Sequence, residues 1–166
     1  MKDSMISYIC HKLRVEDQSK IEIESKKKLT PESVEDLKKY LSKKKGVKHI
    51  RTSVFIDQFL DTPSFDVFHA GASLRLRYKG DGTIVYLQYK GYGFSYKNIL
   101  FRSEFSSGKI KGLVKEESHH DIIHFTETDF MSIIEKHVSK DMKETMTRHL
   151  GLSIIKRIKT SPVICF

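Results

Sequence analysis

Hydrophobic and polar positions alternate strictly along several short stretches of this chain. In "KIEIESKKKL" (20–29), Ile21 and Ile23 face one way, whereas Glu22, Glu24 and Lys26 face the other. The same alternation recurs in "ASLRLRYKG" (72–80), "TIVYLQYKG" (83–91) and "ILFRSEFSS" (99–107). A period of two predicts β-strands with one apolar and one polar face. We expect further strands over about 51–60 and 152–160, a hairpin turn at "GDG" (80–82) and a looser segment over 92–98.

Helical patterns separate these strands. "TPESVEDLKKYLSKKKG" (30–46) predicts a helix with Thr30 as N-cap, Pro31 in the first turn, Gly46 as the stop, and an apolar stripe of Val34, Leu37 and Leu41. A short helical turn is expected over 65–71 and one or two helices over 127–149, whereas residues 1–19 suit a loose arm or an extra strand. This order predicts an α+β fold with a mostly antiparallel sheet. The charged face would lie outside a sandwich or line the lumen of a barrel.

Length and composition favour one domain with a packed interior, because the chain has 166 residues, ten Phe and seven Tyr. No apolar run is long enough to span a membrane, and no secretory signal opens the sequence. The two cysteines, Cys10 and Cys165, form no CxxC pair. We therefore expect a cytoplasmic protein with reduced thiols and no membrane partner.

The net charge of +9 favours anionic partners. Arg75, Arg77, Lys90 and Arg102 share the polar faces of successive predicted strands, so they could gather around an anion such as phosphate or form a solvated outer face. Glu22 and Glu24, about 7 Å apart along one strand face, could hold Mg²⁺ or simply face water. His120 and His124 have a zinc-like spacing but no third ligand nearby.

Five segments together resemble the CYTH, or triphosphate tunnel metalloenzyme, superfamily. "EIESK" (22–26) resembles its ExExK motif, and "FLDTPSFDVFHAGASLRLR" (59–77) resembles its DTP and LRLR segment. "LQYKG" (87–91), "FRSEF" (101–105) and "IIKRIK" (154–159) are similar to its later strands. The resemblance spans about residues 20–160 and implies one tunnel domain over 20–166, preceded by an N-terminal extension over 1–19.

The resemblance implies an antiparallel β tunnel, barrel-like and flanked by helices, with a lumen lined by the charged strand faces. A triphosphate would be held by basic side chains: Lys26, Arg75, Arg77, Lys90, Arg102, Arg157 and Lys159, with Lys156 as an alternative inward residue. Mg²⁺ or Mn²⁺ would be held by Glu22, Glu24 and Glu104. Glu22, Glu24 and Lys26 would form the catalytic motif.

The activity implied by the resemblance is metal-dependent hydrolysis of inorganic triphosphate, ATP or GTP. The alternatives are a class IV-type adenylyl cyclase and an RNA 5′-triphosphatase, whose partner would be an RNA 5′ end. Two departures favour a further alternative, a non-catalytic module that binds triphosphate or polyphosphate. Ser106 replaces the third acid of the "FRSEF" strand, and "TSPVICF" (160–166) contains no acid where family members continue with a second E-x-E pair. We therefore expect a C-terminally short tunnel, and the sequence leaves open whether the protein is an enzyme.

Overall fold

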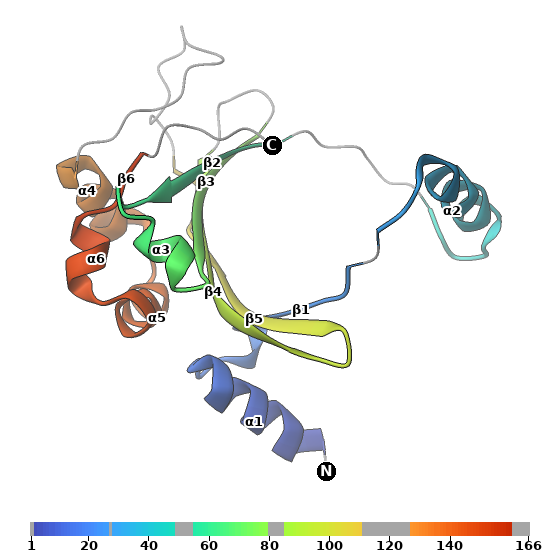
Figure 1. The fold of residues 1–166 in the computed structure, drawn as a ribbon, viewed down its shortest axis with the longest axis horizontal. Helices are drawn as coiled ribbons and strands as arrows, with labels where there is room; N and C mark the ends of the chain where they lie inside the picture. The colour runs from blue at the N-terminus through green and yellow to red at the C-terminus, as the bar shows by residue number, and fades with distance from the viewer. Residues whose placement is uncertain (1, 27, 49–54, 80–84, 111–126, 161–166) are drawn as a thin grey trace, which may run out of the picture.

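The computed structural model describes residues 2–26, 28–48, 55–79, 85–110 and 127–160. Its centre is a six-stranded sheet of order β1-β5-β4-β3-β2-β6, in which every pairing is antiparallel (Figure 1). The strands are β1 (Ile21–Glu24), β2 (Phe55–Asp61), β3 (Ser73–Lys79), β4 (Val85–Tyr96), β5 (Ile99–Ser106) and β6 (Lys159–Thr160). The α+β prediction is confirmed. Within the described residues the sheet curves but stays open, because β1 and β6 do not pair with each other.

The helices flank this sheet. They are α1 (Lys2–Leu13), α2 (Pro31–Lys43), α3 (Asp66–His69), α4 (Glu127–His137), α5 (Lys140–Leu150) and α6 (Leu152–Lys156), with a 3₁₀ turn at Gln18–Lys20. Helices α4, α5 and α6 lie on one side of the sheet, and α2 lies on the other (Figure 1). The two predicted helices over 127–149 and the turn at 66–69 are therefore confirmed.

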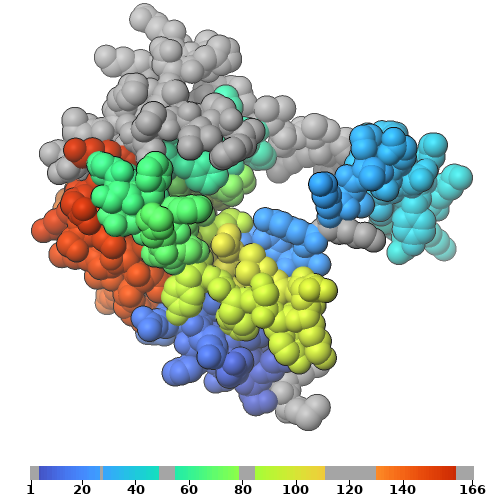
Figure 2. All heavy atoms as spheres, viewed as in Figure 1, coloured from blue at the N-terminus to red at the C-terminus, as the bar shows by residue number. Residues whose placement is uncertain are grey.

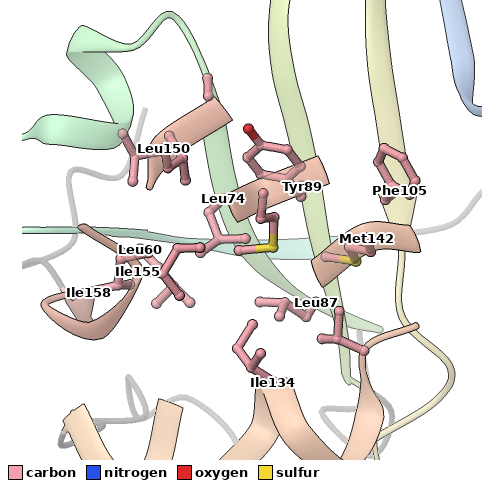
Figure 3. Packing of buried hydrophobic residues seen from close by; sticks show 14 of the residues in the cluster. Leu60, Leu74, Leu87, Tyr89, Phe105, Ile134, Met142, Leu150, Ile155 and Ile158 are labelled. Carbon is pink, nitrogen blue, oxygen red and sulfur yellow. The ribbon is translucent and has the colours of Figure 1, made fainter. Parts of the chain in front are cut away.

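The core fills the space between the sheet and helices α4–α6 (Figure 3). Alternate strand residues supply one half of it, among them Leu74, Leu87, Tyr89 and Phe105. Helical residues supply the other half, among them Ile134, Met142 and Ile155. Each of these side chains contributes about 1.5–3 kcal/mol by leaving water, so this face anchors the sheet and leaves the opposite face free for polar residues.

The N-terminal segment is a helix, so the expectation of a loose arm or strand over 1–19 is wrong. Ile9 and Leu13 of α1 are buried in the core together with Val15. Tyr92 donates a hydrogen bond from its hydroxyl to the Lys12 carbonyl at 2.7 Å and ties the end of α1 to β4. The amphipathic pattern of this segment is weak and hides the helix, because its apolar residues are not confined to one face: Met5, Ile6 and Tyr8 stay exposed.

Residues 152–160 form α6 followed by the two-residue strand β6, and not the single strand expected there. The buried residues of this segment are Ile155 and Ile158. Their spacing of three fits a helical face toward the core and would place them on opposite faces of a strand. Gly151, at φ 81°, ends α5 and lets the chain turn directly into α6.

Strand β4 continues to Tyr96, so the looser segment expected over 92–98 is also wrong. Lys97 and Asn98 both have positive φ, 48° and 62°, and form the two-residue turn that joins β4 to β5. Such turns match the twist of paired strands and favour Asn. Strand β1, in contrast, ends at Glu24, well before the end of the alternating "KIEIESKKKL" stretch. The predicted turn at 80–82, His120, His124 and Cys165 lie outside the described residues.

Helix α2 begins as predicted, because the Thr30 side chain accepts a hydrogen bond from the Ser33 backbone N–H at 3.3 Å. Its apolar stripe, however, is not packed: no residue of α2 is buried. In Figure 2 this helix forms a separate lobe, and the surface of the molecule is hollowed on the side that faces it.

Candidate functional site

The sheet face that points away from the core carries most of the predicted site. Alternation on β3, β4 and β5 puts Arg75, Arg77, Lys90, Arg102 and Glu104 on this face, and all five are partly buried. The register places Glu104 opposite Lys90, and Arg102 opposite Glu22 of β1. We call this surface the charged face. It is opposite the helix-covered core and looks toward α2 (Figure 1).

Two arginines on β3 share one carboxylate of β2. Arg77 donates to Asp57 Oδ1 from Nε and to Oδ2 from a terminal nitrogen, both at 2.7 Å. Arg75 donates to Asp57 Oδ2 at 2.9 Å and to Gln88 Oε1 of β4 at 3.0 Å. These bonds hold both guanidinium groups in a fixed orientation on the charged face.

The ionisation of this trio follows from its geometry. Burial alone would raise the pKa of Asp57, but the hydrogen bond from Arg77 and the charges of Arg75, Arg77 and Lys90 outweigh it and lower that pKa. The same hydrogen bond raises the pKa of Arg77. The Asp57 carboxylate is therefore ionised, and it offsets part of the positive charge of the face.

Lys90 forms the second centre of the charged face. Its Nζ donates to Glu22 Oε1 at 2.6 Å and lies 3.5 Å from Glu104 Oε1. The Lys90 and Glu22 side chains are only 16% and 21% exposed, so solvent screens this pair weakly. One ammonium thus lies between carboxylates of β1 and β5.

Two polar atoms on this face are buried without a hydrogen-bond partner: Glu22 Oε2 and Arg102 Nε. Such atoms cost about 1–3 kcal/mol each when they stay unpaired, and native proteins contain few of them. Glu22 and Arg102 are direct cross-strand neighbours. One acceptor and one donor at this part of the charged face are therefore available to a bound group.

Four of the predicted site residues are placed differently. Lys26 lies beyond the end of β1, is 78% exposed and pairs with Glu24 at 3.4 Å. Arg157 ends α6 and pairs with Asp66 of α3 at 3.1 Å. Lys159 lies opposite Asp61 on β6, at the far edge of the sheet. The structure therefore brings six of the predicted residues together. Of the other four, Lys26, Arg157 and Lys159 lie away from these six, whereas Glu24 shares the strand face of Glu22 but pairs with Lys26.

The DTP segment serves the local structure. Asp61 accepts hydrogen bonds from the backbone N–H groups of Val67, at 2.9 Å, and Phe68, at 3.0 Å. Thr62 donates its hydroxyl to Asp66 Oδ2 at 2.6 Å. These bonds hold α3 against the end of β2, so this motif positions the chain that leads into Arg75 and Arg77.

The carboxylates fit a divalent cation in part. Glu22 offers a free oxygen, and Glu104 lies near the same ammonium. Mg²⁺ commonly takes one or two protein carboxylates and completes its shell with water and substrate phosphate. Glu24, in contrast, is turned to Lys26, and within the described residues no three acidic, His or Cys side chains group closely enough to hold a metal alone. A cation would therefore rest on Glu22 and Glu104.

Sequence reasoning missed Asp57, Phe55 and Phe59, which share the charged face. The alternation of "FIDQFLD" puts them on one side of β2. Only the register shows that this side meets the arginines, with Asp57 opposite Arg77 and Phe59 opposite Arg75. The available signal was Asp57 itself, an acid in the middle of the strand that precedes the "LRLR" strand in the sequence.

Strand β4 contains a bulge directly after Lys90. Lys90 pairs with Glu104 but Gly93 pairs with Arg102, so β4 holds one extra residue there. Gly91 lies against His149 of α5 and Ser103 of β5, where a Cβ would come within 2.7 Å of His149 Nδ1. The bulge also turns Phe94 toward the core side, where it stacks on Phe101 at 5.4 Å.

Most of the sequence matches one known protein family. The CYTH domain matches residues 20–161, a range that contains every predicted site residue. The chain belongs to the CYTH domain family. CYTH domains bind triphosphate substrates and generally depend on a divalent metal. The resemblance carried by "EIESK" and the "LRLR" segment is therefore confirmed.

Solved structures show the same fold. HpAC1 from Hippeastrum, described as a proposed adenylyl cyclase with a dominant triphosphatase activity, is similar with a TM-score of 0.54 and 18% identity. The alignment covers 78% of this CYTH chain and 56% of the HpAC1 chain, so this chain spans little more than half of that protein's length. No curated protein matches this CYTH chain. None of the described helices has the length and hydrophobicity of a membrane span.

Proposed function

We propose that the charged face binds a triphosphate and hydrolyses it with the help of a divalent metal. The observation that carries this proposal is the set of four cations on β3, β4 and β5 together with the unpartnered Nε of Arg102. Repulsion among such closely placed cations needs anions to offset it. Asp57, Glu22 and Glu104 supply part of that offset, and a triphosphate would supply the rest.

The residues divide the work by position. Arg75 and Arg77, held by Asp57, present oriented guanidinium groups, which suit the paired oxygens of a phosphate. Lys90 and Arg102 add charge next to Glu22, whose unpartnered oxygen could bind a cation. When bound, Mg²⁺ or Mn²⁺ would neutralise phosphate charge and polarise the phosphoryl group. Catalysis would come mainly from positioning and electrostatics.

Inorganic triphosphate, ATP, GTP and an RNA 5′ end all offer the anion that this face requires. An adenylyl cyclase would use the same phosphate contacts but would release pyrophosphate and a cyclic nucleotide. The triphosphatase activity named for HpAC1 supports hydrolysis as the leading hypothesis for this chain. In hydrolysis, water is the only group that has to attack the phosphoryl group.

A non-catalytic binding module is the second candidate. It is favoured by the carboxylates themselves, because Glu22 is bound to Lys90 and Glu24 to Lys26. Lysine in both pairs holds an oxygen that a metal would otherwise take. Such a protein would bind triphosphate through the same arginines and leave it intact.

The hydrolase and the binding module can be distinguished by assaying the purified protein with tripolyphosphate and ATP, each with Mg²⁺ or Mn²⁺. Phosphate release, cyclic AMP formation and thermal stabilisation are measured in parallel on the unaltered protein, on Arg102→Gln and on Glu22→Gln. Arg148→Gln is the matched control, since Arg148 lies on α5 outside the charged face. Metal-dependent phosphate release that falls in Arg102→Gln and Glu22→Gln supports the hydrolase. Stabilisation without phosphate release supports the binding module, cyclic AMP supports the cyclase, and no stabilisation by either ligand overturns the proposal.

A further inference from the structure

Two large aromatic side chains lie exposed on the charged face. Phe55 and Phe59 of β2 are each 47% exposed. They flank Asp57 at alternate positions of the strand, so they share its face. An exposed phenylalanine alone needs no explanation. Two of them on the strand that orients the phosphate-binding arginines are a more specific arrangement.

Both aromatic residues lie beside these arginines. The Arg77 guanidinium carbon lies 5.1 Å from the centroid of the Phe55 ring. Phe59 lies directly opposite Arg75 in the β2–β3 register. Among the described strands, β6 pairs only with Leu60 and Asp61, so nothing pairs with the outer edge of β2 beside these rings.

The charged face therefore changes in character from one side to the other. Glu22 and Glu104 lie at the β1 and β5 side, cations lie on β5, β4 and β3, and the aromatic rings lie on β2, on either side of Asp57. Adjacent strands are about 4.8 Å apart, so Glu104 and Phe59 are separated by three such steps. An extended ligand lying across the strands would meet acids and a metal at one end and aromatic rings at the other.

We propose that Phe55 and Phe59 form the binding site for the ring-bearing end of a nucleoside triphosphate. The terminal phosphoryl group points toward Glu22 and Glu104. The base stacks on the Phe55 and Phe59 rings of β2, which we call the aromatic rim. This inference rests on the proposed function and selects among its substrates, because inorganic triphosphate has no group to occupy the rim. Stacking on an aromatic ring tolerates any base, so the rim selects for a ring and does not read its identity.

Dissociation constants for ATP and for tripolyphosphate, measured by calorimetry on the full chain, test the inference. Phe59→Leu and Phe55→Leu keep an apolar side chain but remove the ring. We expect each to weaken ATP binding about tenfold and to leave tripolyphosphate binding within about twofold. Phe59→Tyr should restore ATP binding, because it restores the stacking surface. Phe68→Leu is the matched control, since Phe68 is 70% exposed on α3 and lies off the charged face.

The outcomes separate this inference from the proposed function. Equal losses for both ligands in Phe55→Leu and Phe59→Leu would show that the rings only support the arginines, and this would overturn the inference alone. Unchanged binding of both ligands would overturn it as well, while the triphosphate site would stand. If the unaltered protein bound neither ligand, the proposed function would fail first and the aromatic rim would fail with it.

Discussion

Lys90 of β4 reaches over β5 to place its Nζ 2.6 Å from Glu22 Oε1 of β1. The two strands are not neighbours, so this ion pair joins three strands of the charged face. It also connects the first described strand with the centre of the sheet, 68 residues further along the chain. The pair therefore links the carboxylates of the face to its cations.

Replacing Lys90 tests this link. Lys90→Met keeps the buried stem but leaves Glu22 with two unpartnered oxygens, so we expect a loss of about 1–3 kcal/mol in the free energy of unfolding. Chemical denaturation measures this loss. The double variant Glu22→Gln/Lys90→Met should cost less than the sum of the two single changes, because the two side chains interact.

An exposed ion pair provides the control for this change. Lys38 and Glu35 lie 2.7 Å apart on α2, but their side chains are 67% and 61% exposed. Lys38→Met should therefore change the free energy of unfolding by no more than about 0.5 kcal/mol. Equal effects of Lys38→Met and Lys90→Met would contradict a buried role for the Lys90–Glu22 pair.

Asp57→Asn separates binding from stability on the charged face. Removing the carboxylate charge frees Arg75 and Arg77 and raises the positive charge of the face by one. We expect tighter, more salt-dependent binding of tripolyphosphate, together with a loss of about 1–3 kcal/mol in the free energy of unfolding. Calorimetry at two salt concentrations and denaturant unfolding measure the two effects. Weaker binding would show instead that the orientation of the arginines matters more than their net charge.

His149 should make folding stability depend on pH. Burial, together with the charges of Arg14 and Arg148, lowers the pKa of His149 below its usual 6.5, although the Leu13 carbonyl opposes the shift. Because the unfolded chain binds more protons below pH 6.5, the stability present above that pH is lost as the pH falls toward the lowered pKa. The slope is at most about 1.4 kcal/mol per pH unit.

Substitution of His149 isolates this contribution. In the neutral form, Nε2 donates to the Leu13 carbonyl at 3.2 Å and Nδ1 accepts from the Tyr89 hydroxyl at 3.0 Å. His149→Gln does not titrate, so the free energy of unfolding should fall less steeply between pH 6.5 and 5 than in the unaltered protein. Parallel slopes for the two proteins would exclude His149 as the group responsible.

Gly91→Ala should disrupt the bulge beneath Lys90. A Cβ at this position would lie 2.7 Å from His149 Nδ1 and closer still to Ser103 Oγ, both on packed elements. Such overpacking costs about 1–3 kcal/mol, and it should also displace Lys90 and weaken tripolyphosphate binding. Gly108→Ala is the control, because a Cβ there would meet nothing within 4 Å. A stable Gly91→Ala protein with normal binding would contradict the supporting role of the bulge.

Much of the fold followed from local pattern. Alternation predicted which residues of β3, β4 and β5 share a face, because a strand turns each successive side chain to the opposite side. The Thr30 cap and the start of α2 were predicted equally well from chemistry within a few residues. The CYTH resemblance, carried by ordered motifs, led to the family and to six residues that the structure brings together.

Other features escaped the sequence because they depend on distant contacts. The helical form of 152–156 is favoured by the core that Ile155 and Ile158 enter, and short apolar runs suit a helix or a strand equally. The apolar stripe of α2 predicted a buried face, yet the helix stands apart from the core.

The sequence by itself determined the faces of the strands, the helix cap and the family. Only the tertiary structure decided which acid meets which base: Glu22 with Lys90, Asp57 with Arg75 and Arg77, and Asp66 with Arg157. The reason is physical. The side a residue faces depends on its own strand, whereas its partner depends on the register between strands, on the β4 bulge and on the curvature of the sheet, which the packed core sets as a whole.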